Sequence, residues 1–295
     1  MLELRHLRYF IAVAEELNFT RAAERVHIDQ TPLSRAVRDL EEELGVQLFV
    51  RAPRRLRLTP AGVRLLDEAR KIFIRVERTK RVVRRTHSLY QAPLHIGVAD
   101  GIAQPMLSDC FARWKSVAPE IPLELKEMRA CELASALRRE EIDVGFSFGV
   151  PQDDAIAQNP AWHYRLMAVL PSAHELASLT VVPMSVLLSF PLLACSEERM
   201  PGLFEQMQGI VRCYTEQATI VGAADTAPGY VTRIASGVGV GLGDEGHTQT
   251  LHRDDVVVLP LAEDERITTY VLHKHQRFGQ ADPVQRFLTH VSTLS

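Results

Sequence analysis

Cysteine and long apolar runs are both scarce in this 295-residue chain. Its four cysteines, Cys110, Cys131, Cys195 and Cys213, are widely spaced and include no CxxC pair, which argues against a disulfide framework. No apolar run approaches the roughly 20 residues that cross a bilayer. The N-terminus, MLELRHLRYF, lacks the apolar core of a signal peptide. We therefore expect a cytoplasmic protein with reduced thiols and no contact with a membrane.

The net charge is also small, but its distribution is uneven. The chain carries a formal charge of −3, which divides into +7 over residues 1–90 and −10 over residues 91–295. A basic segment joined to an acidic body suggests two roles, one of them contact with a polyanion.

Apolar spacing in the basic segment predicts three helices. The first covers 4–17 and the second roughly 20–27, with Thr20 as its cap. For the third we expect Thr31 as the N-cap, Pro32 at the first helical position and Gly45 at the end. The third helix has one apolar stripe, formed by Leu33, Val37, Leu40 and Leu44.

Two short helices joined by a tight turn, the second of them polar and basic at its start, are typical of a helix-turn-helix. Ser34, Arg35 and Arg38 lie off the apolar stripe, where they can reach a major groove. A plain helical hairpin with solvated charges is the alternative. Residues 47–62 favour the DNA-binding interpretation, because they predict a two-stranded wing with arginines near its tip. Those arginines are Arg51, Arg54 and Arg55.

A long helix follows, from Pro60 to about Tyr90. Its apolar and small residues alternate at spacings of four and three from Leu65 onward, which is the pattern of a helix–helix seam. Several of the positions are weak, such as Ala69 and Thr79, so we expect a modest dimer contact.

From Pro93 onward, strand-like and helical patterns alternate. We expect nine strands and five helices, and therefore an α/β body with mainly parallel strands. The expected strands are 94–99, 123–128, 143–148, 164–170, 191–195, 218–223, 237–242, 255–261 and 267–273. The expected helices are 105–116, 131–140, 202–214, 225–236 and 282–293.

Residues 4–62, LRHLRYFIAVAEELNFTRAAERVHIDQTPLSRAVRDLEEELGVQLFVRAPRRLRLTPAG, closely resemble the N-terminal domain of the LysR-type transcriptional regulators. The resemblance implies a winged helix-turn-helix (1–59), a linker helix that pairs two subunits (60–90) and an effector-binding domain (91–295). The last is expected to resemble a type 2 periplasmic binding protein, with lobe I at 91–161 and 267–295 and lobe II at 162–266. It also implies a dimer of dimers.

The resemblance places DNA contacts at Gln30, Thr31, Pro32, Ser34, Arg35 and wing residues near Arg51 and Arg54. We add three further arginines, Arg21, Arg38 and Arg55. Asp29 and Thr31 depart from the family pattern, in which many members have Ser or Ala and then Pro at these positions. The carboxylate of Asp29 would repel DNA phosphate, so the sequence predicts no particular operator.

Ligands of such sheets bind beyond the carboxyl ends of the strands. The loops expected there are 99–104, 128–131, 147–149, 195–199, 224–226 and 243–246. The candidate effector residues on them are Asp100, Gly101, Ile102, Gln104, Arg129, Phe148, Cys195, Ser196, Asp225 and Thr226. Arg129 either pairs with a ligand carboxylate or neutralises Asp100 or Asp225 in the empty cleft.

Three other sequence patterns are weaker evidence of a functional site. GLGDEG (241–246) matches a dinucleotide fingerprint without a good following helix, so we expect no cofactor. His247, His252, His273 and His275 lack ligands at metal spacing, which favours ordinary surface histidines. Cys195 and Cys213 fall in the lobe where peroxide-sensing relatives hold their reactive pair, but the local sequence does not match.

The sequence therefore predicts a ligand-responsive transcriptional regulator and no enzyme, since no nucleophile elbow or Ser/His/Asp arrangement is found. Its expected partners are near-palindromic double-stranded DNA, a small organic anion, further copies of itself and, for an activator, RNA polymerase. A thiol redox switch at Cys195 is the main alternative. A solute-binding protein is disfavoured by the basic segment and by the lack of a signal peptide.

Overall fold

The computed structural model describes residues 2–52, 55–87, 93–99, 101–215, 217–275, 279 and 282–294. The chain divides into two compact units, Met1–Val83 and Arg84–Ser295. None of the described helices is both long enough and apolar enough to span a bilayer.

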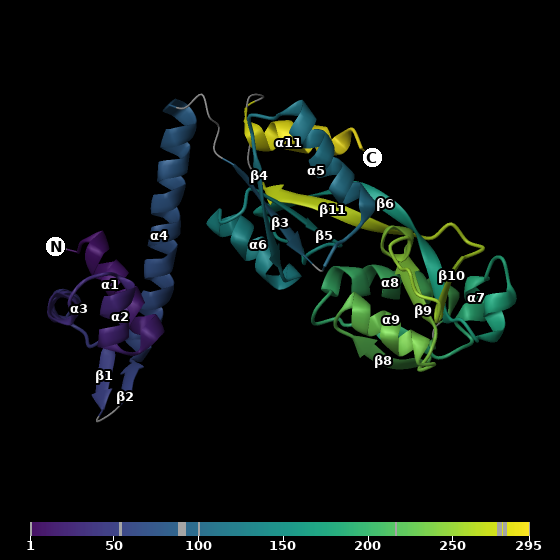
Figure 1. Ribbon diagram of the computed structural model, residues 1–295, viewed down its shortest axis with the longest axis horizontal. Coiled ribbons are helices and arrows are strands. Elements are labelled where there is room, and N and C mark those ends of the chain that lie inside the picture. The colour runs from purple at the N-terminus through teal and green to yellow at the C-terminus, as the bar shows by residue number, and fades with distance from the viewer. Residues whose placement is uncertain are drawn as a thin grey trace. The chain divides into compact units, whose positions relative to one another are not determined.

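The first unit is a three-helix head with a hairpin wing, followed by a long helix (Figure 1). Its elements are α1 (Leu4–Glu16), α2 (Phe19–Arg25), α3 (Gln30–Leu44), β1 (Phe49–Ala52), β2 (Arg55–Leu58) and α4 (Pro60–His87). Strands β1 and β2 pair antiparallel. The predicted winged helix-turn-helix is thus confirmed.

Helix α2 begins differently from the sequence expectation. Asn18, rather than Thr20, is its cap, because the Asn18 side chain accepts the backbone N–H groups of Thr20 and Arg21. Ala22 and Ala23 are both buried, so these small side chains allow the neighbouring helices to approach closely.

Helix α3 also begins earlier than expected. Its first residue is Gln30 and Asp29 occupies the N-cap position, so Thr31 is not the cap and Pro32 lies third in the helix. Pro32 still costs no hydrogen bond there, because the first four N–H groups of a helix have no intrahelical acceptor. The negative charge of Asp29 suits the positive end of the helix dipole.

One apolar core joins the helices of the head to its wing. The ring centroids of Phe10 on α1 and Phe49 on β1 lie 5.5 Å apart within it. The stripe residues of α3 that are buried there are Leu33, Val37 and Leu40. Leu44, the last predicted stripe position, is exposed instead. Gly45 ends the helix in the left-handed conformation, so the stripe is one turn shorter than the pattern suggested.

The start of the predicted seam on α4 packs inside the head. Ala69 is fully buried and Leu65 contacts the apolar core, while Arg70 on the same helix pairs with Glu15 of α1 at 2.6 Å. Ile72, the next seam position, is 37% exposed. A partner helix could therefore use only the seam from Ile72 onward. Tyr90, its last position, lies outside the described residues, as do the side chains of 81–87.

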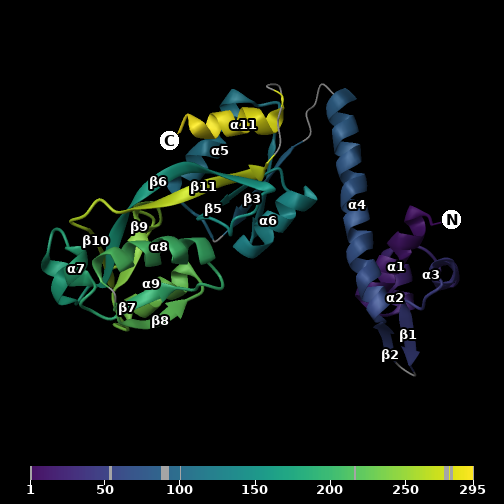
Figure 2. The same cartoon turned by 180° about the vertical axis from the view of Figure 1, so that it is seen from behind.

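The second unit is an α/β body whose helices cover both sides of its sheets (Figures 1 and 2). Its strands are β3 (Leu94–Ala99), β4 (Leu123–Met128), β5 (Val144–Ser147), β6 (Ile156–Pro171), β7 (Leu192–Cys195), β8 (Ile220–Ala224), β9 (Gly241–Asp244), β10 (Val256–Pro260) and β11 (Arg266–Lys274). Its helices are α5 (Pro105–Val117), α6 (Ala130–Arg139), η1 (Glu175–Ser178), α7 (Met184–Leu187), α8 (Pro201–Tyr214), α9 (Ala227–Ala235), α10 (Glu245–Thr248) and α11 (Pro283–Ser292).

The expectation of mainly parallel strands is wrong. Among the described strands, β3–β4, β3–β5 and β7–β8 pair parallel. The pairs β5–β11, β6–β11, β6–β10 and β6–β9 are antiparallel. The reason is that β6 and β11 carry the chain between the two groups of parallel strands, and they run against them.

These two crossing strands make the body two-lobed. The first part of β6, from Ile156 to Arg165, pairs with β11, and its last part, from Leu166 to Pro171, pairs with β9 and β10. Lobe I therefore holds β3, β4 and β5 with α5, α6 and α11, and lobe II holds β7–β10 with α7–α10. Trp162, close to the crossing, stacks on Phe146 with ring centroids 5.4 Å apart.

Candidate functional site

The exposed face of α3 gathers the residues expected to meet DNA. Ser34 is half-buried, and its neighbours on this face are exposed, namely Gln30, Thr31, Pro32, Arg35 and Arg38. The Thr20 hydroxyl donates to Gln30 Oε1 at 3.2 Å, which ties α2 to the start of α3. The turn between the two helices therefore presents the first turns of α3 outward.

The arginines of the head fall into two groups. Among the described residues, Arg35 and Arg38 have no ion-pair partner, so their charge is available to phosphate or to base edges. Arg21, also predicted to contact DNA, pairs with Glu16 at 2.8 Å. Its charge is thus partly neutralised within the head.

Glu41 joins α3 to the wing. Although it belongs to a run of three glutamates at the end of α3, Glu41 is only 5% exposed. Its Oε1 accepts the backbone N–H groups of Leu48 at 2.7 Å and Phe49 at 3.1 Å. The wing strand is therefore fixed to α3 by the buried side chain of Glu41. Arg54 and the side chains of Arg51 and Arg55 lie outside the described residues.

In the body, side chains from both lobes meet where the strands end. The Gln206 side chain of α8 donates to the carbonyl of Phe148 at 2.6 Å and to that of Thr268 at 2.9 Å. It also accepts the N–H of Thr268 at 2.8 Å. Nearby, a Cβ added to Gly202 would lie 2.4 Å from the carbonyl oxygen of Gly149. Only glycine allows α8 to approach this loop of lobe I so closely.

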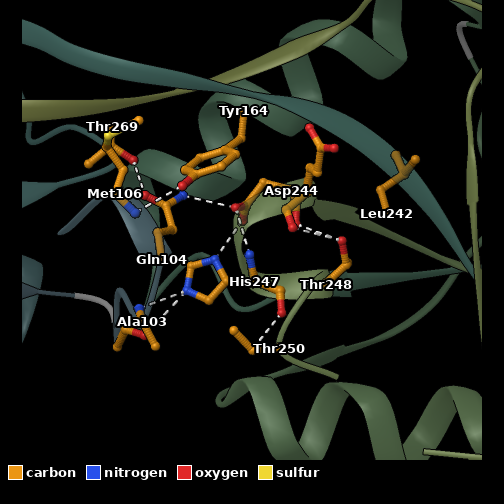
Figure 3. A network of polar contacts seen from close by, with 12 residues as sticks. Ala103, Gln104, Met106, Tyr164, Leu242, Asp244, His247, Thr248, Thr250 and Thr269 are labelled. Carbon is orange, nitrogen blue, oxygen red and sulfur yellow. Dashed lines mark hydrogen bonds and ion pairs between the residues drawn. The ribbon is translucent and has the colours of Figure 1, made fainter. Parts of the chain in front are cut away.

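A second set of contacts between the lobes centres on Asp244, at the end of β9 (Figure 3). Gln104 Nε2 donates to Asp244 Oδ1 at 2.9 Å. Gln104 Oε1 accepts from Trp162 Nε1 and Thr269 Oγ1, both at 2.7 Å. The amide of Gln104 is thus held on both sides, and it fixes the carboxylate of Asp244 from lobe I.

His247 extends this network to the surface of the cleft. Its Nδ1 lies 2.7 Å from Asp244 Oδ2, and its Nε2 accepts the backbone N–H of Ala103 at 3.1 Å. The ring packs against Phe148, with centroids 5.9 Å apart. One imidazole therefore connects the 101–104 loop of lobe I to the β9–α10 turn of lobe II (Figure 3).

The two ionisable groups of this network shift each other's pKa. Burial alone would raise the pKa of Asp244, but hydrogen bonds from His247 and Gln104 and the imidazolium charge outweigh it, so the pKa is lowered. Burial alone would lower the pKa of His247, but the bond to Asp244 and its charge outweigh it, so the pKa is raised. The pair therefore favours a carboxylate beside an imidazolium.

The other predicted effector residues lie on the expected loops in different environments. Asp100 lies outside the described residues. Those that are exposed are Gly101, Arg129, Asp225 and Thr226, and those that are buried are Ile102, Gln104, Phe148, Cys195 and Ser196. Thr226 caps α9 by accepting the N–H of Gly229 at 3.2 Å, and Ser196 Oγ accepts the N–H of Arg199.

Arg129 has a different partner from the two acids that the sequence suggested. Its guanidinium donates to Glu132 at 2.7 Å, one turn into α6, and the Arg129 side chain remains 58% exposed. The hydrogen bond to Glu132 and its charge raise the pKa of Arg129, and the charge of Glu198 in lobe II adds to this. Arg129 is thus exposed at the start of α6, and its guanidinium has donors left for a further anion.

Sequence reasoning missed Asp244, His247 and Gln206. The sequence predicts the loop 243–246 near the ligand but gives no candidate effector residue on it, and it favours an ordinary surface role for His247. The sequence signal that could have indicated Asp244 and His247 is the run GDEGH (243–247), which directly follows an expected strand. The GLGDEG match itself runs through β9 into α10, a four-residue helix, which is not a dinucleotide-binding crossover.

The described cysteines and histidines show no further site. No group of three His, Cys, Asp or Glu side chains in the described part of the chain could hold a metal ion. Cys195 is buried at the end of β7, whereas Cys213 is exposed on the last turn of α8 and its thiol lies 3.4 Å from the carbonyl of Gly209. The thiol switch stays a prediction.

Two family profiles match this chain. That of the bacterial regulatory helix-turn-helix protein, lysR family, covers residues 4–63, and that of the LysR substrate binding domain covers residues 87–294. CatR of Pseudomonas putida, an HTH-type transcriptional regulator, is 32% identical over 289 residues, 98% of each chain. YnfL of Escherichia coli (strain K12), an uncharacterized regulator of the same type, is 28% identical over 293 residues, also 98% of each chain.

The fold is shared with solved structures. Full-length CbnR, crystallised with its target DNA, superposes with a TM-score of 0.84 over 100% of both chains at 21% identity. The predicted order of parts, a winged helix-turn-helix, a long helix and a two-lobed α/β body, is confirmed by this likeness.

Proposed function

Because the chain belongs to the LysR family of bacterial transcriptional regulators, we propose that it reads a near-palindromic operator through the first turns of α3. The observation that carries this is the pair Arg35 and Arg38, exposed and without an ion-pair partner in the described part of the head. Gln30, Thr31, Pro32 and Ser34 would contact bases and phosphates beside them, and the wing arginines would follow the backbone.

Selection of binding sites from random duplexes by the full-length chain tests this proposal. Two heads related by a dimer axis require an inverted repeat, with half-sites one helical turn apart or a multiple of it. A selected consensus without two-fold symmetry would contradict the proposal.

The linker and oligomer belong to the same proposal. We assign residues 1–59 to DNA binding, 60–90 to pairing of subunits and 91–295 to effector binding. The exposed Ile72 on α4 supports a partner helix there, since an apolar side chain on a helix seam gains stability by burial. Pairs of such dimers would form the tetramer, and an activator would also contact RNA polymerase.

We further propose that the effector is a small organic anion bound between the lobes. Suitable donors are the Arg129 guanidinium and the backbone N–H of Ala103, which now donates to His247. The contacts of Gln206 and Gln104 across the cleft support a ligand-dependent arrangement of the lobes, which would alter the spacing of the DNA-binding heads.

A thermal-shift screen of the full-length chain tests the effector class. Small carboxylates and their uncharged primary amides are compared at equal concentration, because a ligand that binds only the folded state raises Tm by mass action. Stabilisation by acids but not by their amides is expected. Stabilisation by neutral compounds alone would contradict an anionic effector.

A further inference from the structure

The strongest unexplained feature of the body is the contact between Ala103 and His247. The N–H of Ala103 in lobe I donates to His247 Nε2 in lobe II at 3.1 Å. Ala103 is exposed and the His247 side chain is 22% exposed, so both residues extend to the surface of the body. A ligand that enters between the lobes at this point meets a backbone donor and an imidazole together.

The hydrogen-bond pattern defines the protonation state of the ring. An Nε2 that accepts from Ala103 has no proton, so this one hydrogen bond favours a neutral ring with its proton on Nδ1, directed at Asp244 Oδ2, and opposes the imidazolium that Asp244 favours. If Nε2 gains a proton, two donors face each other across 3.1 Å. The nearest described acceptor for that new N–H is the carbonyl of Gly101 at 3.4 Å, which is a long contact.

The groups around the ring favour its charged form. Burial opposes a charge on the ring, but the hydrogen bond and charge of Asp244 on β9 and the carbonyl of Gly101 outweigh it and raise the pKa of His247. The phenol of Tyr164 on β6 is influenced by Asp244, by Glu245 of α10 and by Asp109 of α5. The described part of the adjacent loop, Gly101 to Gln104, has no titratable side chain. Protonation is thus promoted by the Asp244 carboxylate on one side of the ring and opposed by the N–H of Ala103 on the other.

We propose that Nε2 of His247 and the N–H of Ala103 together bind one oxygen of an anionic effector, and that His247 takes up a proton as the effector binds. This rests on the proposed function, because it concerns the same effector site. An anionic oxygen satisfies both donors at once and neutralises the imidazolium. It thereby removes the conflict that opposes protonation in the empty site.

The scaffold behind His247 is suited to this role. Asp244 orients the ring through Nδ1, and Gln104 holds Asp244 while its own amide oxygen is fixed by Trp162 and Thr269. The ring is therefore held in one orientation before any ligand arrives. A held donor loses less entropy on binding than a mobile one.

Binding in this way also changes the distance between the lobes. Two N–H donors that share one acceptor oxygen stand about 4.5–5 Å apart, since each hydrogen bond is about 2.9 Å long. The Ala103 nitrogen and His247 Nε2 are now 3.1 Å apart. The 101–104 loop must therefore move away from α10 as the effector enters, which links occupancy to the arrangement of the lobes.

The experiment is a pH titration of the histidine ring signals by NMR. Full-length protein carrying 13C-labelled histidine is titrated alone, with sodium acetate as the smallest carboxylate, and with acetamide as its uncharged counterpart. Spectra of His247→Gln assign the His247 signal by its loss. His273, a partly buried histidine on β11 whose pKa is lowered by burial, is the internal control in the same spectra.

Acetate is expected to raise the pKa of His247 by about half a unit or more, because it binds the protonated form preferentially. Acetamide should have no such effect, and the pKa of His273 should not respond to either compound. An unchanged His247 pKa in acetate, or an equal change in acetamide, would overturn the inference. The titration is read on the unsubstituted protein, so a folding defect in the variant would not obscure the result.

The two proposals can fail separately. If carboxylates stabilise the full-length chain in the thermal-shift screen but acetate does not change the pKa of His247, only the role of His247 is wrong. If no carboxylate stabilises the chain and acetate has no effect on His247, the anionic effector is wrong as well. For an effector that binds His247, the dissociation constant should rise up to tenfold per pH unit between the pKa of His247 in the free protein and its pKa in the complex, and should level off above the latter.

Discussion

At the scale of single residues, Glu41 shows how one buried carboxylate can position a whole wing. Its two backbone hydrogen bonds, to the N–H groups of Leu48 and Phe49, have no substitute if the side chain is removed. We expect Glu41→Ala to lower the free energy of unfolding of the head by about 2–4 kcal/mol, because two buried donors lose a charged acceptor. Chemical denaturation of the full-length chain measures this.

Glu42 provides the matched control for that measurement. It is the next residue on the same helix and is exposed. Its replacement by alanine should change the unfolding free energy by less than about 0.5 kcal/mol. Equal effects of the two substitutions would mean that the Glu41 contacts contribute nothing.

The Asp244–His247 pair makes the stability of the body depend on pH. The pKa of His247 is raised above 6.5, so its contribution is complete below that pH and is lost as the pH rises through the folded-state value. The pKa of Asp244 is lowered below 3.8, so its contribution is complete above that pH and is lost on acidification. Their combined contribution is therefore largest between about pH 4 and pH 6.5.

Thermal unfolding of the full-length chain across neutral pH tests this dependence. Tm of the body should fall as the pH rises above 6.5 and the imidazolium loses its proton. His247→Gln should flatten the profile over that range, because glutamine does not titrate. A variant that keeps the pH profile of the unsubstituted protein would contradict the assignment.

Sequence reasoning placed Arg35 and Arg38 on the exposed face of α3 but missed the contact of His247 with Ala103, for a physical reason. The face of α3 follows from the spacing of Leu33 and Val37 within one helix, so local periodicity defines it. The contact between Ala103 and His247 joins residues 144 positions apart and depends on how two lobes approach. No local sequence pattern predicts a contact between residues so far apart in the chain.

At the scale of elements, we expect replacement of two helical glycines by alanine to change the stability of the protein in opposite directions. Gly209 lies within α8, and an added Cβ there would meet no atom within 4 Å. Gly209→Ala should stabilise the body by about 0.5–1 kcal/mol through helix propensity alone. Gly62 lies in the first turn of α4, where an added Cβ would be 2.2 Å from the carbonyl oxygen of Leu48.

Gly62→Ala should therefore destabilise the head by about 1–3 kcal/mol, since the chain before the wing would have to move. Thermal or chemical unfolding of both variants against the unsubstituted chain measures the two effects. If both substitutions shift stability in the same direction, the close approach of α4 to Leu48 is not as the structure has it.

The elements themselves were largely predictable, and the errors share one cause. Long periodic helices such as α5 and α8 were placed within two residues of their bounds. Strand β6 was predicted at 164–170 but begins at Ile156, because its first half carries polar residues and crosses between the lobes. Crossing strands such as β6 and β11 also caused the error in strand direction, since orientation depends on topology and not on local composition.

At the scale of the whole molecule, the chain combines a basic head with an acidic body. The charge of +7 over residues 1–90 favours DNA, while −10 over the remainder disfavours contact of the body with phosphate. Binding should therefore weaken with added salt, with a slope set by the number of phosphate contacts of the heads.

Operator affinity of Arg35→Ala as a function of salt tests the central claim most directly. Arg139→Ala is the control, since it removes an equal charge from an exposed arginine of the body. Loss of Arg35 should weaken operator binding by about 1–3 kcal/mol per subunit, reduce discrimination against random DNA and leave unfolding unchanged. Arg139→Ala should bind as the unsubstituted chain does. Unchanged affinity, specificity and salt slope for Arg35→Ala would contradict the assignment of α3 as the recognition helix.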